Sequence, residues 1–128
     1  MIRSLRSNKG FTLVEIMIVV AIIGILIAIA VPGFLKARET SRINACQQNQ
    51  VKIDGAVQQR IIDENFEDQA AAVAGLNLAD LVGDANYIRT TPECPSSGTY
   101  SFNDTGPAVS CSIASHVYPG SAGGGGGT

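Results

Sequence analysis

The side chains best suited to covalent or metal chemistry in this sequence are three cysteines and a single histidine. Cys94 and Cys111 lie on either side of a segment with strand and turn signals around Tyr100, so a disulfide between them would close a hairpin. Closing such a loop contributes on the order of 3 kcal/mol, and disulfides persist in exported proteins. We therefore predict a Cys94–Cys111 disulfide. The alternatives are a bond from Cys46 to either cysteine, or three reduced thiols, because spacing does not fix connectivity.

His116 follows Cys111 closely and raises the question of a metal site. With Cys94 and Cys111 it supplies three donors of the kind that bind zinc, but no fourth ligand is evident and no paired Cys-x-x-Cys spacing occurs. Cys46 falls on an apolar helical stripe and is most simply a small core residue. We predict no metal site and no cofactor. Because the sequence also lacks nucleophile-elbow, phosphate-loop and zinc-protease motifs, we predict that the chain is not an enzyme.

Glu15 is distinctive because it borders a long apolar segment. Residues 16–34 carry no charge, and their number is close to the ~20 that a helix needs to cross a bilayer. The alternative is a buried core helix, but the rest of so short a chain could not cover a helix that is apolar on every side. An unpaired carboxylate at bilayer depth costs up to about 2.5–3.5 kcal/mol. Glu15 therefore either reaches toward the headgroups or meets a positive group on a neighbouring chain.

The residues ahead of the apolar segment are basic. Residues 1–10 carry Arg3, Arg6 and Lys9 and no acid, which is typical of an export leader that stays on the cytoplasmic side. An ordinary signal peptide is cleaved after its apolar run, whereas here the run leads directly into a charged segment that begins at Lys36. The whole chain has nine Lys and Arg against eleven Asp and Glu, a net charge of −2. We therefore predict no nucleic-acid partner.

Residues 9–15 read Lys-Gly-Phe-Thr-Leu-Val-Glu. With the apolar run behind them, they resemble the prepilins of the type IV pilin and type II secretion pseudopilin superfamily. The resemblance implies that a prepilin peptidase cuts between Gly10 and Phe11 and then methylates the new amino terminus on Phe11. It also implies that Glu15 pairs with the Phe11 amine of an adjacent subunit and sets the register of assembly. Because the cut precedes the apolar run, the mature protein would keep its membrane-spanning helix.

A helical stripe continues beyond the apolar run. Apolar residues at helical spacing predict that the helix extends to about Asn65, with one face against a small head; they are Ile43, Cys46, Ile53, Val57 and Ile61. Gly24 and Pro32 should weaken the helix locally, since glycine lowers helix propensity and proline removes a hydrogen bond. The resemblance implies that this stretch can unwind in a filament. Two shorter helices, broken near Pro32 or Gly55, are the alternative.

The remaining sequence predicts a small antiparallel sheet. Short runs of β-branched and aromatic residues at 87–90, 99–103 and 109–113 alternate with turn signals, and two or three of them would form strands packed on the helical stripe. The predicted fold is therefore α+β, a long N-terminal helix packed on a small C-terminal sheet, as in pilins. The predicted segments are a leader (1–10), a membrane-spanning helix (11–34), its amphipathic continuation (35–66), a β-rich head (67–119) and a flexible glycine-rich tail (120–128).

The predicted function is structural. We expect a subunit of a type IV pilus-like filament, inserted once in the cytoplasmic membrane and then assembled into a cell-surface or periplasmic fimbrium. The resemblance implies as partners other pilin subunits, the prepilin peptidase and a pilus assembly platform. A type II secretion pseudopilin that drives protein export is an alternative within the same superfamily. A monomeric membrane-anchored binding module is a further alternative, and it would have no need of Glu15.

Overall fold

A computed structural model describes residues 9–119 of the chain. Most of the predicted leader (1–8) and the predicted glycine-rich tail (120–128) lie outside the described residues. The elements are α1 (Leu13–Glu64), α2 (Gln69–Val73), α3 (Leu78–Leu81), β1 (Tyr100–Phe102) and β2 (Val109–Cys111). The chain divides into two compact units, Met1–Arg38 and Glu39–Thr128, which we call the N-terminal unit and the head unit. The predicted combination of a long helix with a small antiparallel sheet is confirmed.

Helix α1 begins and ends at residues suited to those positions. Thr12 precedes the first helical residue, and its Oγ1 accepts a hydrogen bond from the backbone N–H of Glu15 at 3.2 Å. A threonine hydroxyl in this position satisfies one of the amides that a helix start leaves unpaired. At the other end Asn65 has a φ of 54°, a left-handed conformation that asparagine tolerates and that terminates the helix.

Between these ends α1 is a single helix. It continues through Gly24, Pro32 and Gly55 without interruption, so the alternative of two shorter helices is not observed. Pro32 lies inside the helix, where it costs one backbone hydrogen bond. Local unwinding at Gly24 and Pro32 within a filament stays a prediction.

In the N-terminal unit the apolar part of α1 has no protein cover. The most apolar 18-residue window of the helix has a mean hydropathy of 3.1, and none of it is buried. By length and composition the helix can cross a membrane. An apolar surface of this extent is characteristic of contact with lipid or with another protein.

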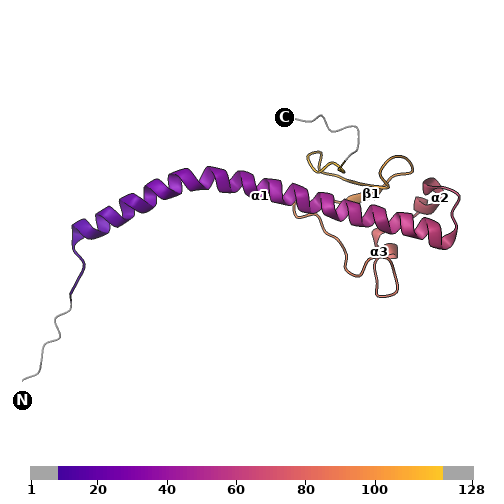
Figure 1. Cartoon of the computed structure of the whole chain (residues 1–128), viewed down its shortest axis with the longest axis horizontal. Coiled ribbons are helices and arrows are strands. Elements are labelled where there is room, and N and C mark those ends of the chain that lie inside the picture. The colour runs from indigo at the N-terminus through magenta and orange to yellow at the C-terminus, as the bar shows by residue number, and fades with distance from the viewer. Residues whose placement is uncertain (1–8, 120–128) are drawn as a thin grey trace, which may run out of the picture. The chain divides into compact units, whose positions relative to one another are not determined.

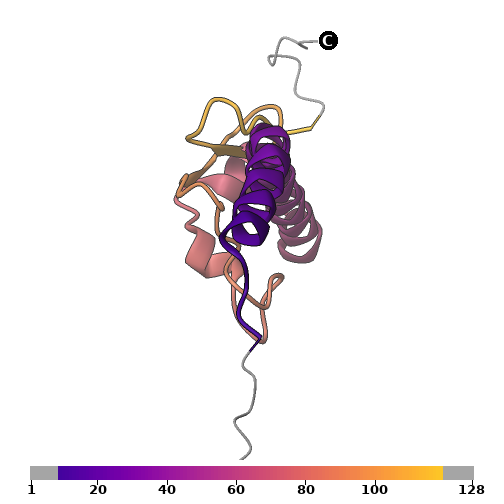
Figure 2. The same cartoon turned by 90° about the vertical axis from the view of Figure 1, so that its left-hand side faces the viewer.

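In the head unit the second half of α1 carries the core, and the other elements gather along it (Figure 1). The predicted stripe is confirmed, because Cys46, Ile53 and Val57 have no exposed surface. The core cluster consists of Ile53, Ala56, Val57, Leu76, Leu81, Ala108 and Val109. The end-on view in Figure 2 shows the short helices and strands on one side of this half of α1. One face of the helix is therefore left open.

The sheet of the described head unit has two strands. β1 and β2 pair in antiparallel register, with Tyr100 opposite Cys111 and Phe102 opposite Val109. Of the predicted two or three strands, two are therefore observed, and at 87–90 only Ile88 pairs, in an isolated parallel bridge with Val82.

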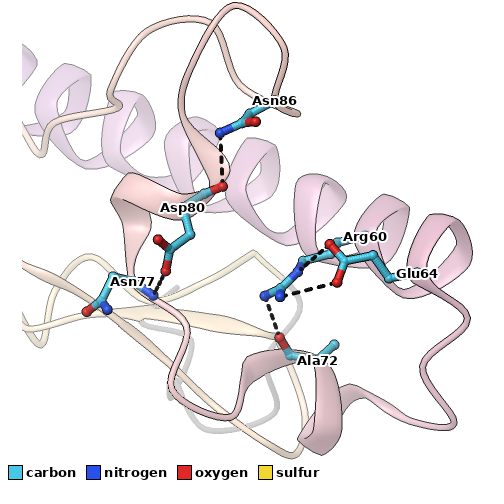
Figure 3. Close-up of polar contacts among 6 residues, drawn as sticks. All are labelled: Arg60, Glu64, Ala72, Asn77, Asp80 and Asn86. Carbon is cyan, nitrogen blue, oxygen red and sulfur yellow. Dashed lines mark hydrogen bonds and ion pairs between the residues drawn. The ribbon is translucent and has the colours of Figure 1, made fainter.

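Polar contacts fix the connection between α1 and β1. The Arg60 guanidinium donates to the Glu64 carboxylate at 3.1 Å and to the Ala72 carbonyl at 3.0 Å, which ties α2 to the end of α1 (Figure 3). Asp80 accepts a hydrogen bond from the Asn77 backbone N–H at 2.9 Å and so caps α3. These contacts supplement the packing of Leu76 and Leu81, which this segment contributes to the core cluster.

Polar side chains of α1 that flank the stripe hold the loops that follow. The Asn49 side chain donates to the Glu93 carbonyl at 2.8 Å. Asp54 accepts two hydrogen bonds, from the backbone N–H of Ala108 at 2.9 Å and from the Tyr118 hydroxyl at 3.1 Å. Burial and the nearby Asp54 carboxylate raise the pKa of Tyr118, so this hydroxyl keeps its proton and donates.

Candidate functional site

The predicted processing site lies just ahead of α1. Gly10 and Phe11 belong to no helix or strand, and both are exposed, with 80% of the Phe11 surface accessible. A peptide bond in such a segment can be reached by a peptidase without unfolding the helix behind it. Cleavage after Gly10 and methylation of Phe11 remain predictions.

Glu15 lies in the first turn of α1 and is exposed. A carboxylate there is favoured by the partial positive charge of the helix start. Its backbone N–H donates to Thr12 Oγ1, and its exposed side chain can be reached by a neighbouring chain. The geometry is therefore compatible with the predicted pairing with a neighbouring subunit.

The head unit brings four potential ligands together. One donor atom from each of Cys46, Cys94, Cys111 and His116 lies within 4.8 Å of the others. Cys46 comes from α1, Cys94 from the loop before β1, Cys111 from the end of β2, and His116 from the turn that follows. Cys46 and His116 have no exposed surface and Cys94 has 7%. The cluster thus joins three parts of the head unit that are distant in sequence: α1, the loop before β1, and β2 with the turn that follows it.

The two cysteines of the predicted disulfide are neighbours in this cluster. Their Sγ atoms are 3.8 Å apart, and all three cysteines are free thiols. Sulfur atoms in a disulfide are about 2.05 Å apart. The Cys94–Cys111 disulfide therefore stays a prediction.

His116 and Cys46, the other two members of the cluster, also make close contacts. His116 Nδ1 lies 3.3 Å from Cys94 Sγ, and the Tyr100 hydroxyl lies 3.5 Å from Cys46 Sγ. The sequence predicts Cys46 as a core residue, with a bond to Cys94 or Cys111 as an alternative, and shows no fourth ligand for a metal. One signal in the sequence points to Cys46 as a neighbour of the other cysteines. Cys46 lies on the same apolar stripe as Ile53, and that stripe packs against the C-terminal segment that carries them.

A tight turn follows Cys94 and brings the backbone close to the cysteine sulfurs. Ser96 and Gly98 follow Cys94 closely, and their backbone amides favour its thiolate. The turn is closed by the Ser97 N–H, which donates to the Cys94 carbonyl at 3.0 Å, and Ser97 has a left-handed φ of 60°. A Cβ added to Gly98 would lie 2.6 Å from Cys111 Sγ, so a side chain cannot fit there without a shift. The glycine allows the two sulfurs to approach.

The surroundings affect the thiols differently. Burial alone would raise the pKa of Cys94, but the amide hydrogen bonds from Ser96 and Gly98, with smaller contributions from Cys46 and His116, lower it to about 7. Burial raises the pKa of Cys111 to about 11, despite a hydrogen bond from the Ile113 backbone. Cys94 is thus more readily converted to a thiolate than Cys111.

Gln50 is the polar neighbour of the cluster. Its side chain is fully buried, and its Nε2 donates to the His116 carbonyl and lies 3.6 Å from Cys46 Sγ. Gln50 Oε1 and His116 Nε2 are both buried, and neither has a hydrogen-bond partner among the described residues. Buried polar atoms without partners are uncommon, and they mark this cluster as unusual.

Comparison with known proteins identifies the chain. A family model for the prokaryotic N-terminal methylation motif matches residues 5–31. Across 116 residues the chain is 32% identical to PilA5, the major component of the narrow type IV pilus of Thermus thermophilus, and the match covers 91% of this chain and 89% of that relative. The chain belongs to the type IV pilin family. This confirms the resemblance drawn from residues 9–15.

Two further relatives show the range of this pilin family. Over 42 residues the pilin is 57% identical to the type IV major pilin PilA of Myxococcus xanthus, a match that covers 33% of this chain and only 19% of that relative. Over 91 residues it is 35% identical to the competence protein ComGC of Bacillus subtilis, covering 70% of this chain and 83% of that relative. No solved structure matches the chain.

Membership of the pilin family has direct consequences for function. Pilins are structural subunits and not enzymes, as the relatives named as pilus components indicate. They assemble with other pilins into filaments, and they combine an N-terminal hydrophobic helix with a place in an extracellular pilus. The exposed apolar half of α1 is the surface suited to that assembly.

Proposed function

We propose that this pilin is inserted once in the cytoplasmic membrane with its leader on the cytoplasmic side, cleaved after Gly10, methylated on Phe11, and polymerised into a type IV pilus-like filament. One observation carries the proposal: the apolar half of α1 is wholly exposed, directly behind an accessible Gly10–Phe11 bond. Cleavage at that bond removes the basic leader and leaves the apolar helix at the new amino terminus.

The apolar surface explains why such a subunit needs two environments. Exposure of this helix to water is unfavourable by roughly 25 cal/mol for each Å² of apolar surface. Lipid covers the helix before assembly, and the same helices of neighbouring subunits cover it within a filament. Transfer from one to the other keeps the apolar surface out of water throughout.

Glu15 gives this transfer a direction. A carboxylate at the edge of an apolar helix is penalised in lipid when it is unpaired. The positive amine of Phe11 on an adjacent subunit would remove that penalty, and attraction between opposite charges is stronger where the surroundings are apolar. The pair would therefore favour assembled over stored subunits and fix their register.

The partners of this process follow from the proposal. A prepilin peptidase recognises the leader and the Gly10–Phe11 bond, and an assembly platform extracts the cleaved subunit from the membrane. Gly24 and Pro32 are the positions at which α1 would unwind as the subunits pack.

Substitution of Glu15 tests the proposal. Glu15→Leu removes the charge, and we expect the variant to enter the membrane and be cleaved, but to leave sheared surface fractions without filaments. Glu15→Asp is the matched control because it keeps the charge, and we expect it to retain part of the filament yield. If Glu15→Leu stays in the membrane more firmly and function is unchanged, the chain is a membrane-anchored binding module and the proposal is wrong.

A competence role is the second candidate, favoured by the match to the competence protein ComGC over most of that relative's length. Deletion of the gene distinguishes the two roles. Loss of surface pili with normal DNA uptake supports the pilus subunit, whereas loss of DNA uptake in a strain that still makes pili supports the competence role. Loss of protein export alone would instead indicate a type II secretion pseudopilin.

A further inference from the structure

We propose that Cys46, Cys94, Cys111 and His116 bind one Zn²⁺ ion in the head unit. Three thiolates and one imidazole form one of the standard ligand sets of structural zinc sites. Here they come together as four donor atoms within 4.8 Å of one another, with Cys46, Cys94 and His116 buried and Cys111 partly so. Such sites are closed, with no position left for water or substrate.

The distances within the cluster suit a tetrahedral ion. With Zn–S bonds of about 2.3 Å and a Zn–N bond of about 2.0–2.1 Å, tetrahedral ligands lie roughly 3.8 Å apart for two sulfurs and roughly 3.6 Å apart for sulfur and nitrogen. The separation of Cys94 Sγ from Cys111 Sγ is 3.8 Å, and that of Cys94 Sγ from His116 Nδ1 is 3.3 Å. Small side-chain adjustments would bring the four atoms onto one ion.

The composition of the cluster favours an ion over a disulfide. A Cys94–Cys111 disulfide would use two of the four groups and would leave the Cys46 thiol and the His116 imidazole without a function at the same point. Both are completely buried. Histidine and cysteine are rarely gathered in this way by packing alone, and soft thiolates with an imidazole select zinc over calcium or magnesium. The structure thus supplies Cys46 as the fourth ligand.

The shell around the four donors is that of a metal site. A side-chain amide donor lies beside the cluster, because Gln50 Nε2 is 3.6 Å from Cys46 Sγ. Amide donors of this kind stabilise thiolates and orient them. Gln50 Oε1 is a buried acceptor without a partner among residues 9–119, and its own amide nitrogen bonds the His116 carbonyl. His116 Nε2 is likewise buried without a partner among those residues.

An ion at this point would hold the head unit together. It would link α1 through Cys46, the loop before β1 through Cys94, β2 through Cys111 and the C-terminal turn through His116. The sheet between them is formed by two strands of three residues each, which is too small to be stable alone. Small domains commonly rely on a metal or a disulfide for this reason.

The test measures zinc and thiols in the full chain, purified in detergent without chelator or reductant. We expect about one Zn²⁺ per chain by elemental mass spectrometry. We also expect all three cysteines to resist alkylation until the protein is denatured with a chelator, after which three labels are added. Cys46→Ser and His116→Ala should each lower zinc content at least about tenfold. Ser115→Ala, a change at an exposed neighbouring residue, is the control and should keep its zinc.

Cys46→Ser distinguishes zinc binding from the Cys94–Cys111 disulfide, because Cys46 takes no part in that disulfide. The proposal is overturned if the wild-type chain is free of zinc and shows the mass of a disulfide with one alkylatable cysteine. It is equally overturned if the chain is free of zinc with three reactive thiols, or if Cys46→Ser keeps its zinc. The wild-type measurements decide the matter even if the variants do not fold.

Discussion

Gly98 shows how closely single residues of the head unit are fitted. A methyl group added there would lie 2.6 Å from Cys111 Sγ and 3.1 Å from the Ile113 side chain. Cys111 ends β2 and Ile113 follows it closely, so at least one of these side chains would have to shift. Gly98 is therefore required by space at this position.

We predict that Gly98→Ala lowers the free energy of unfolding of the head unit by about 1–3 kcal/mol, the usual cost of overpacking. Gly55→Ala is the matched control, because a Cβ at Gly55 would meet nothing within 4 Å in α1, and it should stabilise the helix by about 0.5–1 kcal/mol. Chemical denaturation followed by tyrosine fluorescence measures both. Equal effects of the two substitutions would contradict the packing described for Gly98.

Asp54 is the second residue on which the head unit depends. It accepts the backbone N–H of Ala108, a residue with no exposed surface. We predict that Asp54→Ala costs about 1–3 kcal/mol of stability, because the buried amide loses its acceptor. Asp54→Asn retains one acceptor oxygen and should lose less, by the same denaturation measurement. An equal loss in both variants would mean that the Ala108 hydrogen bond contributes little.

The N-terminal motif is easier to recognise in the sequence than the head cluster is. Glu15 was recognisable because a lone charge beside an apolar run is costly, a property visible in one dimension. The sequence offers Cys46 as a partner of Cys94 only as one alternative, because the two approach only after the stripe of α1 packs on the C-terminal segment. Gln50 was also missed, because a glutamine is not expected on a buried apolar stripe.

At the scale of elements, α1 changes character along its length. Its first half is apolar on all sides, and its second half presents one buried face to the head unit. Periodicity predicted this second half well because an amphipathic stripe is a strong signal. The end of the helix was predicted at about Asn65, and α1 ends at Glu64.

The buried face of α1 yields a sharp prediction. Ile53 has no exposed surface, whereas Val51 on the same turn is 46% exposed. Ile53→Ala should therefore destabilise the head unit by about 2–5 kcal/mol through loss of burial and the cavity left behind. Val51→Ala should change stability by no more than about 0.5 kcal/mol. The assignment of the buried face would be wrong if thermal unfolding showed Val51→Ala to be the more harmful change.

The short strands were harder to predict. Residues 87–90 have the composition of a strand, yet only Ile88 pairs with Val82, after a turn in which Gly83 has a φ of 151°. The hydrogen bonds of Ile88 to Leu81 and Gly83 use its backbone groups locally. Composition indicates that a segment suits a sheet, but the availability of a partner decides whether a strand forms.

At the scale of the whole molecule, two requirements meet in one chain. The N-terminal unit has an apolar surface that must be covered by lipid or by other subunits, while the head unit has its own small core and can remain in water. The family assignment joins these requirements in a filament subunit. In the proposed function, cleavage after Gly10 is the step that precedes transfer of the subunit from membrane to filament.

The most direct test is therefore the intact mass and N-terminal sequence of the chain recovered from sheared surface filaments, compared with the chain in membranes. We predict that the filament form begins at N-methylated Phe11 and retains the whole of α1. A filament form that begins at Met1, or a chain cut after Pro32, would contradict the account, because the leader would then not be a prepilin leader.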